Sequence, residues 1–298
     1  MKHLRTAMMI LIGAVVFATS TLARAGENDI PLPMVYQHLN MVYSVSDADK
    51  ANEFYGDLLG LARIRDLNFP GKTYMIRYMG GTTEVKLIVT GEDLPSHPGG
   101  IDTALGVRWV TFNMPAEKKD SVVSKLKKYG YPILPSNDSR GDAIATRDGD
   151  DNHVEIIFHK GVPSDALKKQ FEIGLTVSDL EESRTFISTV LGYKENEPLT
   201  LKDGQIEISF QAGDTRLKLR SFDKELTSVT APPFEEFGLN LVQHIVRDVP
   251  AVRELFIQRG GNIHTEPFQL GKLATIMFMD GPDGILYEFA GPPIAAKK

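Results

Sequence analysis

Cysteine is absent from all 298 residues of this sequence. That absence excludes disulfide bonds, thiolate metal sites, a cysteine nucleophile and a lipid-modified amino-terminal cysteine. Tryptophan occurs once, at Trp109, and the 7 histidines show no H-x-H or H-E-x-x-H spacing. The sequence also lacks the G-x-S-x-G elbow, the phosphate-cradling G-x-x-x-x-G-K-[ST] loop and a dinucleotide fingerprint after a strand. These absences leave serine hydrolases, P-loop NTPases and Rossmann oxidoreductases without support.

Acidic residues outnumber basic residues in most of the chain. Lys2, Arg5 and Arg24 lie within the first 25 residues, where no acid occurs, so the remainder has 30 bases against 39 acids and a formal net charge of −9. The sequence shows no basic run and no interleaving of basic and aromatic residues, and an acidic chain repels a phosphate backbone on average. We therefore expect no nucleic-acid partner.

The first 25 residues are typical of an export signal. Lys2 and Arg5 give a positive start, residues 7–18 are uncharged and mostly apolar, and residues 23–25 form an A-x-A cleavage site. The alternative is an uncleaved anchor, but the 18-residue span without charge is at the short limit for crossing a bilayer. We predict a periplasmic or secreted mature protein without stable membrane anchoring.

An internal repeat divides the chain into two halves. Identical residues recur at a constant offset of 132 positions. The matches are Val45-Ser46-Asp47 with Val177-Ser178-Asp179, Phe54 with Phe186, Leu59-Gly60 with Leu191-Gly192, Asp148-Gly149 with Asp280-Gly281, and Asp151 with Asp283. So many matches at one offset indicate a duplicated domain.

Each half divides again into two similar units. In the first unit, residues 37–45 alternate like a strand, and the apolar spacing then becomes helical. Ser46 and Asp49 have the spacing of a capping box, and Gly60 stands where a helix would end in a left-handed residue. Three strand-like runs follow at 62–66, 74–79 and 84–89. The same order recurs in a second unit at 107–158 and twice more at 171–291, giving a third and a fourth unit.

These motifs resemble one known family. A strand running into V-S-D, followed by F-x-x-x-x-L-G, is similar to the opening unit of the vicinal oxygen chelate superfamily, the glyoxalase, bleomycin-resistance and extradiol-dioxygenase group. The D-G-P-D-G…E sequence of 280–288 resembles the family's final hairpin, and 148–155 is a second version of it. The resemblance implies an α+β fold in which four βαβββ units pair into two similar domains. Each domain would be a curled mixed sheet forming a cup, with the helices outside.

The expected domain order follows from the repeat. We expect a signal peptide at 1–25, a first domain of two units at 36–158, a linker at 159–170 and a second domain of two units at 171–291. Some relatives assemble a site across units from different domains. Pairing the first unit with the fourth is therefore an open alternative, and it would combine His38, Glu84 and Glu288, with His244 if the register of its strand shifts.

Strand parity predicts which side chains line the cup. In the first strand, one parity continues the apolar pattern of the following helix: Met41, Tyr43 and Val45. Because alternate residues of a strand face opposite sides, the other parity should face the cup. Its members are His38, Asn40, Val42 and Ser44.

In catalytic relatives, the resemblance implies a divalent metal in the cup, and Mn, Fe, Ni or Zn would suit its ligands. Those ligands come from the first strand of each unit and the last strand of the second. The corresponding positions here are Asn40, Trp109 and Glu155 in the first domain and Glu172, Leu241 and Glu288 in the second. Trp109 and Leu241 are not metal ligands, so neither domain presents a full set.

Two functions remain open at this point. The protein is a divalent-metal lyase, isomerase or dioxygenase acting on a small molecule with vicinal oxygens, or a metal-free binding protein of the bleomycin-resistance type. In the enzyme, Glu155 and Glu288 would be catalytic and would hold the metal together with His38. In either case Trp109 and Asn40 would contact the substrate or ligand, since a tryptophan can stack on a planar molecule.

Overall fold

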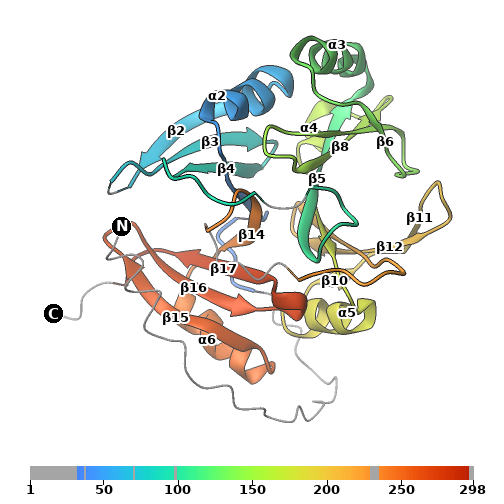
Figure 1. The fold of residues 1–298 in the computed structure, drawn as a ribbon. Helices are drawn as coiled ribbons and strands as arrows, with labels where there is room; N and C mark the ends of the chain where they lie inside the picture. The colour runs from blue at the N-terminus through green and yellow to red at the C-terminus, as the bar shows by residue number, and fades with distance from the viewer. Residues whose placement is uncertain (1–31, 37, 70, 97–98, 229–234, 295–298) are drawn as a thin grey trace.

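The computed structural model describes residues 32–36, 38–69, 71–96, 99–228 and 235–294. In these residues the strands form an eight-stranded and a nine-stranded sheet, and helices lie at the outside of the curled sheets (Figure 1). No described helix combines the length and apolar character of a transmembrane segment. The predicted signal at 1–25 lies outside the described residues.

The eight-stranded sheet joins the first unit to the fourth. In spatial order its strands are β15 (Asn262–Leu270), β16 (Ala274–Asp280), β17 (Leu286–Gly291), β14 (Gly238–Ile245), β1 (Asn40–Ser44), β4 (Thr83–Val89), β3 (Tyr74–Gly80) and β2 (Ala62–Asn68). The junction is an antiparallel pair of β1 and β14, in which Asn40 lies opposite Gln243.

The nine-stranded sheet joins the second unit to the third. Its main path is β10 (Lys194–Glu195), β12 (Ile206–Ala212), β13 (Thr215–Arg220), β9 (Phe171–Thr176), β5 (Gly106–Pro115), β8 (His153–His159), β7 (Asp142–Arg147) and β6 (Leu134–Pro135). β11 (Leu199–Thr200) pairs with β12 beside this path. The junction is again antiparallel, between β5 and β9.

This pairing corrects one sequence-based expectation. We expected the units to pair within 36–158 and within 171–291, but each sheet takes one unit from each of these segments. The repeat identifies the units, whereas the partner of each first strand depends on which strand edges meet in the folded chain. The expected linker at 159–170 contains the short helix α4 (Ser164–Leu167) and connects β8 to β9 of one sheet.

Helices begin at aspartates that follow the first strands. Asp47 accepts hydrogen bonds from the backbone N–H groups of Asp49 and Lys50, and Asp179 accepts one from Glu182. The predicted capping box at Ser46 is therefore displaced by one residue. The helical segments are α2 (Ala48–Ala51), the π-helix η1 (Asn52–Leu58), η2 (Ala116–Lys118), α3 (Lys119–Tyr129), α5 (Leu180–Thr189), α6 (Val249–Gln258) and η3 (Pro282–Gly284).

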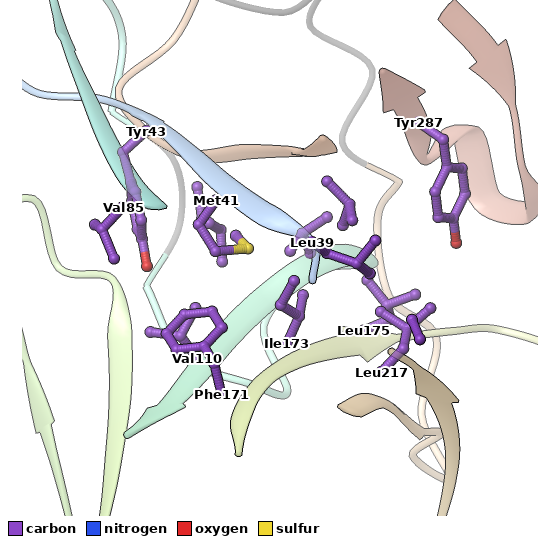
Figure 2. Packing of buried hydrophobic residues seen from close by; sticks show 14 of the residues in the cluster. Leu39, Met41, Tyr43, Val85, Val110, Phe171, Ile173, Leu175, Leu217 and Tyr287 are labelled. Atoms are coloured by element: carbon purple, nitrogen blue, oxygen red, sulfur yellow. The ribbon is translucent and has the colours of Figure 1, made fainter. Parts of the chain in front are cut away.

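The predicted parity of the first strand is confirmed by the core. Met41 and Tyr43 belong to a large apolar core that also contains Val110 and Phe171 of the other sheet, and Figure 2 shows these side chains facing one another between the sheets. Val42, of the opposite parity, belongs to a separate apolar cluster. Each sheet therefore turns one face toward a shared core and the other toward a cup.

Candidate functional site

Cup A is the face of the eight-stranded sheet that points away from the shared core. Its polar group consists of Asn40 of β1, Arg77 of β3, Glu84 and Lys86 of β4, Gln243 of β14 and Glu288 of β17. The strand register places Gln243 opposite both Asn40 and Glu288. Side chains from the two ends of the chain therefore meet in this cup.

A chain of hydrogen bonds fixes the orientation of the two amides in cup A. The backbone N–H of Glu84 donates to Asn40 Oδ1 over 3.0 Å, so Asn40 Nδ2 is left to donate to Gln243 Oε1 over 3.2 Å. Lys86 donates to the same Gln243 oxygen. Gln243 Nε2 then donates to Glu288 Oε1 over 2.9 Å. Because each amide has one oxygen and one nitrogen, the first bond determines the direction of all the others.

An apolar group lies on the same face, beside the polar one. Its buried members are Val42, Met75, Ile88 and Leu241, and its half-buried members are Leu67, Phe69 and Phe278. The register connects the two groups, because Val42 lies opposite Lys86 and Phe278 lies opposite Glu288. Cup A thus presents fixed polar groups next to an apolar and aromatic surface, as small-molecule sites commonly do.

The charges of cup A are incompletely compensated. Burial lowers the pKa of Lys86, and the nearby Glu84 and Glu288 offset only part of this effect. Burial also raises the pKa of Glu288, although Gln243 and Lys86 act in the opposite direction. Arg77 donates to Glu84 Oε2 over 3.0 and 2.8 Å, so the guanidinium rather than Lys86 is the main partner of Glu84. Perturbed lysine and glutamate side chains on one face of a curled sheet make this face a candidate functional site.

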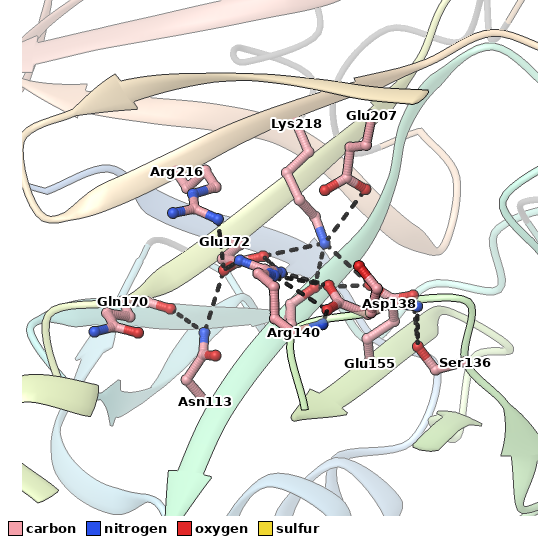
Figure 3. Close-up of polar contacts among 12 residues, drawn as sticks. Asn113, Ser136, Asp138, Arg140, Glu155, Gln170, Glu172, Glu207, Arg216 and Lys218 are labelled. Atoms are coloured by element: carbon pink, nitrogen blue, oxygen red, sulfur yellow. Dashed lines mark hydrogen bonds and ion pairs between the residues drawn. The ribbon is translucent and has the colours of Figure 1, made fainter. Parts of the chain in front are cut away.

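Cup B is the corresponding face of the nine-stranded sheet. It is defined by Trp109 and Thr111 of β5, Glu155 of β8, Glu172 of β9, Glu207 of β12, and Lys218 and Arg220 of β13. Figure 3 shows its carboxylates gathered around Lys218. Lys218 Nζ lies 2.8 Å from Thr111 Oγ1, 3.0 Å from Glu155 Oε2 and 3.1 Å from Glu172 Oε2. The ammonium donates hydrogen bonds to Thr111 and Glu155 and forms an ion pair with Glu172, and its side chain has 0% exposure.

The carboxylates of cup B are held in their charged form. Burial would raise the pKa of Glu155, but Lys218 and Arg220 outweigh it and hold the pKa well below its ordinary value. In the same way, Lys218 and Arg140 overcome the effect of burial on Glu172 and lower its pKa to about 2. Arg140 reaches Glu172 from the segment after β6 and donates to both of its carboxylate oxygens. Cup B is a closed network of ion pairs.

Trp109 lies in cup B with 0% exposure. Its ring packs on Gly174, where an added Cβ would come within 1.9 Å of the indole. The guanidinium of Arg220 lies 4.9 Å from the ring centroid, on the aromatic face. The predicted role of Trp109 as a contact for a ligand stays a prediction, and the structure shows its ring packed between protein groups.

The predicted metal ligands do not come together. Glu155 lies in cup B and Glu288 in cup A, while His38 is half-buried before β1 and stacks on Tyr36 at 5.2 Å between ring centroids. One ion cannot contact all of His38, Glu155 and Glu288, so this set is corrected. Asn40 and Glu288 share cup A, as the alternative pairing of the first and fourth units requires.

The side chains at the expected metal position do not fit a divalent cation. In cup A the oxygens of Asn40 and Gln243 already accept hydrogen bonds, and a lysine lies among them. In cup B a lysine ammonium contacts the carboxylates directly. Across the described ranges, no group of three or more His, Asp or Glu side chains has the arrangement of a metal site.

Sequence reasoning missed Lys86, Lys218 and Gln243. Trp109 and Leu241 were assigned to the ligand positions, but the residues beside Glu155 and Glu288 on the neighbouring first strands are Thr111 and Gln243. Thr111 lies two residues after Trp109, and Gln243 lies two residues after Leu241, on the same face of the strand in each case. The lysines had a signal in the sequence, because Lys86 and Lys218 are also separated by 132 positions.

The comparisons with known proteins agree with this architecture. Residues 169–289 match the model of the Glyoxalase/Bleomycin resistance protein/Dioxygenase superfamily. Glyoxalase I from Zea mays superposes with a TM-score of 0.66 and 20% identity, covering 85% of this chain and 91% of that chain. A putative dioxygenase from Bacillus subtilis gives a TM-score of 0.64 and 13% identity, covering 90% of this chain and 87% of that chain. No curated protein matches the sequence. At these identities the likenesses show the fold, and they confirm the predicted α+β arrangement of paired units.

Proposed function

We propose that this protein binds a small organic molecule in cup A without a metal ion. The proposal is supported by the match of residues 169–289 to the model of the Glyoxalase/Bleomycin resistance protein/Dioxygenase superfamily and by the fold that the chain shares with glyoxalase I. The observation that carries the proposal is the hydrogen bonding of the buried Lys86 ammonium. Its ammonium donates to Gln243, while Glu84 Oε2 is 3.7 Å away, beyond hydrogen-bond length. Glu84 is therefore a loose ion-pair partner of the ammonium, and this leaves N–H donor capacity of Lys86 for an oxygen of a ligand.

The ligand is defined by the two parts of cup A. An acceptor oxygen, as in a carbonyl or carboxylate group, would take the N–H groups that Lys86 has available. An apolar or aromatic body would then lie against the half-buried Leu67, Phe69 and Phe278, which cover the buried part of the apolar group. Removing such a body from water contributes about 25 cal/mol per Å² of apolar surface.

Electrostatics also support a ligand at this place. The pKa of Lys86 is lowered by burial that its neighbours do not fully offset. An acceptor oxygen brought to the ammonium would favour its charged form. Cup B offers no such opportunity, because Lys218 already contacts three oxygens.

The proposal is tested by thermal unfolding of the mature protein with a compound panel. The panel pairs compounds of one aromatic or branched aliphatic body, with and without a carboxylate or carbonyl oxygen. We expect oxygen-bearing members to raise the melting temperature of the wild type, since a ligand that binds only the folded state stabilises it. Lys86→Met should remove the shift. Lys168→Met, at a lysine whose side chain is 59% exposed, is the matched control and should keep it.

Two results would contradict the proposal. One is a set of ligands whose effect is the same in wild type and Lys86→Met. The other is elemental analysis that finds one tightly bound divalent metal per chain, lost in Glu288→Gln. That second result would favour the metal-dependent lyase, isomerase or dioxygenase.

The proposal includes export of the mature protein. Its support is the positively charged start, the apolar stretch and the A-x-A site of residues 1–25. Amino-terminal sequencing of the protein from the producing cells should begin at Gly26. A chain that still begins at Met1 would contradict cleavage.

A further inference from the structure

The two cups contain a lysine at the same position of the repeat. Lys86 in β4 and Lys218 in β13 are separated by the offset that relates the two halves of the sequence. The register around them is also repeated, because Lys86 lies opposite Val42 of β1 and Lys218 lies opposite Gly174 of β9. Val42 and Gly174 are separated by the same offset. The duplicated fold therefore places an ammonium at the same point of each curled sheet.

In cup B this ammonium lies among oxygen atoms from four other strands. Lys218 Nζ lies within hydrogen-bond distance of Thr111 on β5, Glu155 on β8 and Glu172 on β9. Glu207 Oε2 of β12 lies 3.9 Å from the same nitrogen. These include the first strands of both units and the last strand of the second unit. The resemblance assigned metal ligands to those same strands.

The charge balance of cup B depends on Lys218. Cup B contains four buried carboxylates, which belong to Glu155, Glu172, Glu207 and Asp138. They form ion pairs with three buried or half-buried cations, Lys218, Arg220 and Arg140. Without Lys218, four carboxylates would face two guanidinium groups, with Arg216 a further cation 3.9 Å from Glu172. A buried carboxylate that loses its partner is costly, so the cluster requires a cation at this position.

We propose that Lys218 is a built-in cation that takes the place of a metal ion in cup B, and that a hard divalent cation with oxygen ligands can replace it. The oxygens around Nζ suit such an ion, because Glu155, Glu172, Glu207 and Thr111 offer carboxylate and hydroxyl groups and no sulfur or imidazole. The contacts of Thr111, Glu155 and Glu172 at 2.8 to 3.1 Å exceed Ca²⁺–oxygen distances of about 2.3–2.6 Å, so these groups must move inward by less than about 1 Å. Glu207, at 3.9 Å, must move by about 1.3–1.6 Å. Ca²⁺ needs the smallest movement and tolerates irregular geometry, so it is the probe of choice.

The experiment replaces the ammonium by an ion. Lys218→Ala shortens the side chain and vacates the space among the carboxylates. We expect the full-length variant to unfold at a lower temperature than the wild type, and Ca²⁺ in hundredfold excess over its dissociation constant to raise that temperature by about 5–10 °C. Calorimetric titration should give one Ca²⁺ per chain. The wild type should respond neither to Ca²⁺ nor to a chelator.

Two further variants identify the site. Lys218→Ala combined with Glu172→Ala removes the lysine and one carboxylate, and it should lose the response to Ca²⁺. Lys86→Ala is the matched control in the other cup, where both amide oxygens already accept hydrogen bonds, and it should not take up Ca²⁺. If Lys218→Ala folds only when Ca²⁺ is present, the proposal is supported.

The proposal is overturned if Lys218→Ala folds and binds no Ca²⁺, if it stays unfolded with and without Ca²⁺, or if the wild type binds a divalent ion in cup B. None of these outcomes concerns ligand binding in cup A, so the two proposals fail or succeed separately.

Discussion

At the residue scale, the two cups differ in how far their buried charges are compensated. Lys218 contacts three oxygens and its pKa is raised, because Glu155, Glu207 and Glu172 outweigh the effect of burial. Lys86 has one hydrogen-bond acceptor in the described part of the chain, and its pKa is lowered by burial. Equivalent residues of a duplicated fold thus have different surroundings: Lys218 lies in a closed network of ion pairs, and Lys86 is the group that the proposed ligand would contact.

The charge network of cup B predicts a pH dependence of stability. The pKa of Glu172 falls from its ordinary 4.5 to about 2 in the folded protein. A carboxylate whose folded pKa is depressed contributes stability above its unfolded pKa and loses it as the pH falls toward the folded pKa. We therefore expect the free energy of unfolding to decrease between about pH 4.5 and pH 2, measured by urea unfolding at several pH values.

Glu172→Gln should reduce this dependence. At pH 7 the variant should be less stable than the wild type by about 3–5 kcal/mol, because Lys218 and Arg140 lose a buried partner, and its stability should fall less on acidification. Glu181→Gln, at a glutamate whose side chain is 75% exposed, is the control and should follow the wild type. Equal slopes for Glu172→Gln and the wild type would refute the assignment.

At the element scale, strand and helix positions followed from local patterns, whereas the helix-capping residue did not. Ser46 of the first V-S-D motif had the spacing of a capping box, but in both motifs the aspartate accepts the backbone N–H groups. Tertiary contacts explain the shift, because the backbone N–H of Ser46 donates to Asp150 Oδ1 and that of Ser178 to Asp283 Oδ2. Each serine thus ties the helix start to the final hairpin of another unit in its half.

Substitutions at the first helix distinguish the two capping residues. Asp47→Ala should lower the free energy of unfolding by about 1 kcal/mol, because the N–H groups of Asp49 and Lys50 lose their acceptor. Ser46→Ala keeps the backbone N–H that bonds to Asp150 and should change stability by less than about 0.5 kcal/mol. Chemical denaturation of both variants measures the difference. The reverse order of effects would restore the capping box at Ser46.

At the scale of the whole molecule, the pairing of units makes the two halves of the chain interdependent. β1 and β14 form the centre of one sheet, and β5 and β9 form the centre of the other. Each pair takes one strand from residues before 160 and one from residues after 170. Both cups therefore contain side chains from both halves, and neither half can assemble a complete cup.

Cleavage between the halves tests this pairing. Gly161 is exposed, so a protease recognition sequence inserted after it should be cut in the folded protein. We expect the two fragments to elute together in size-exclusion chromatography and to separate only in denaturant, because the sheets hold strands from both. Fragments that separate in native buffer would show that the units pair within each half.

The sequence by itself determined the units and the face on which each side chain lies. The constant offset between matching motifs revealed the duplication. Strand parity assigned Asn40 to a cup, and the family resemblance assigned Glu155 and Glu288, and these side chains are 1%, 1% and 5% exposed. Only the tertiary structure decided which units share a sheet and which residues meet. Parity depends on the local geometry of one strand, whereas pairing depends on contacts between strands that are distant in the sequence, such as Asn40 of β1 with Gln243 of β14. For that reason the separation of Glu155 from Glu288, and the central position of the two lysines, appeared only in the folded chain.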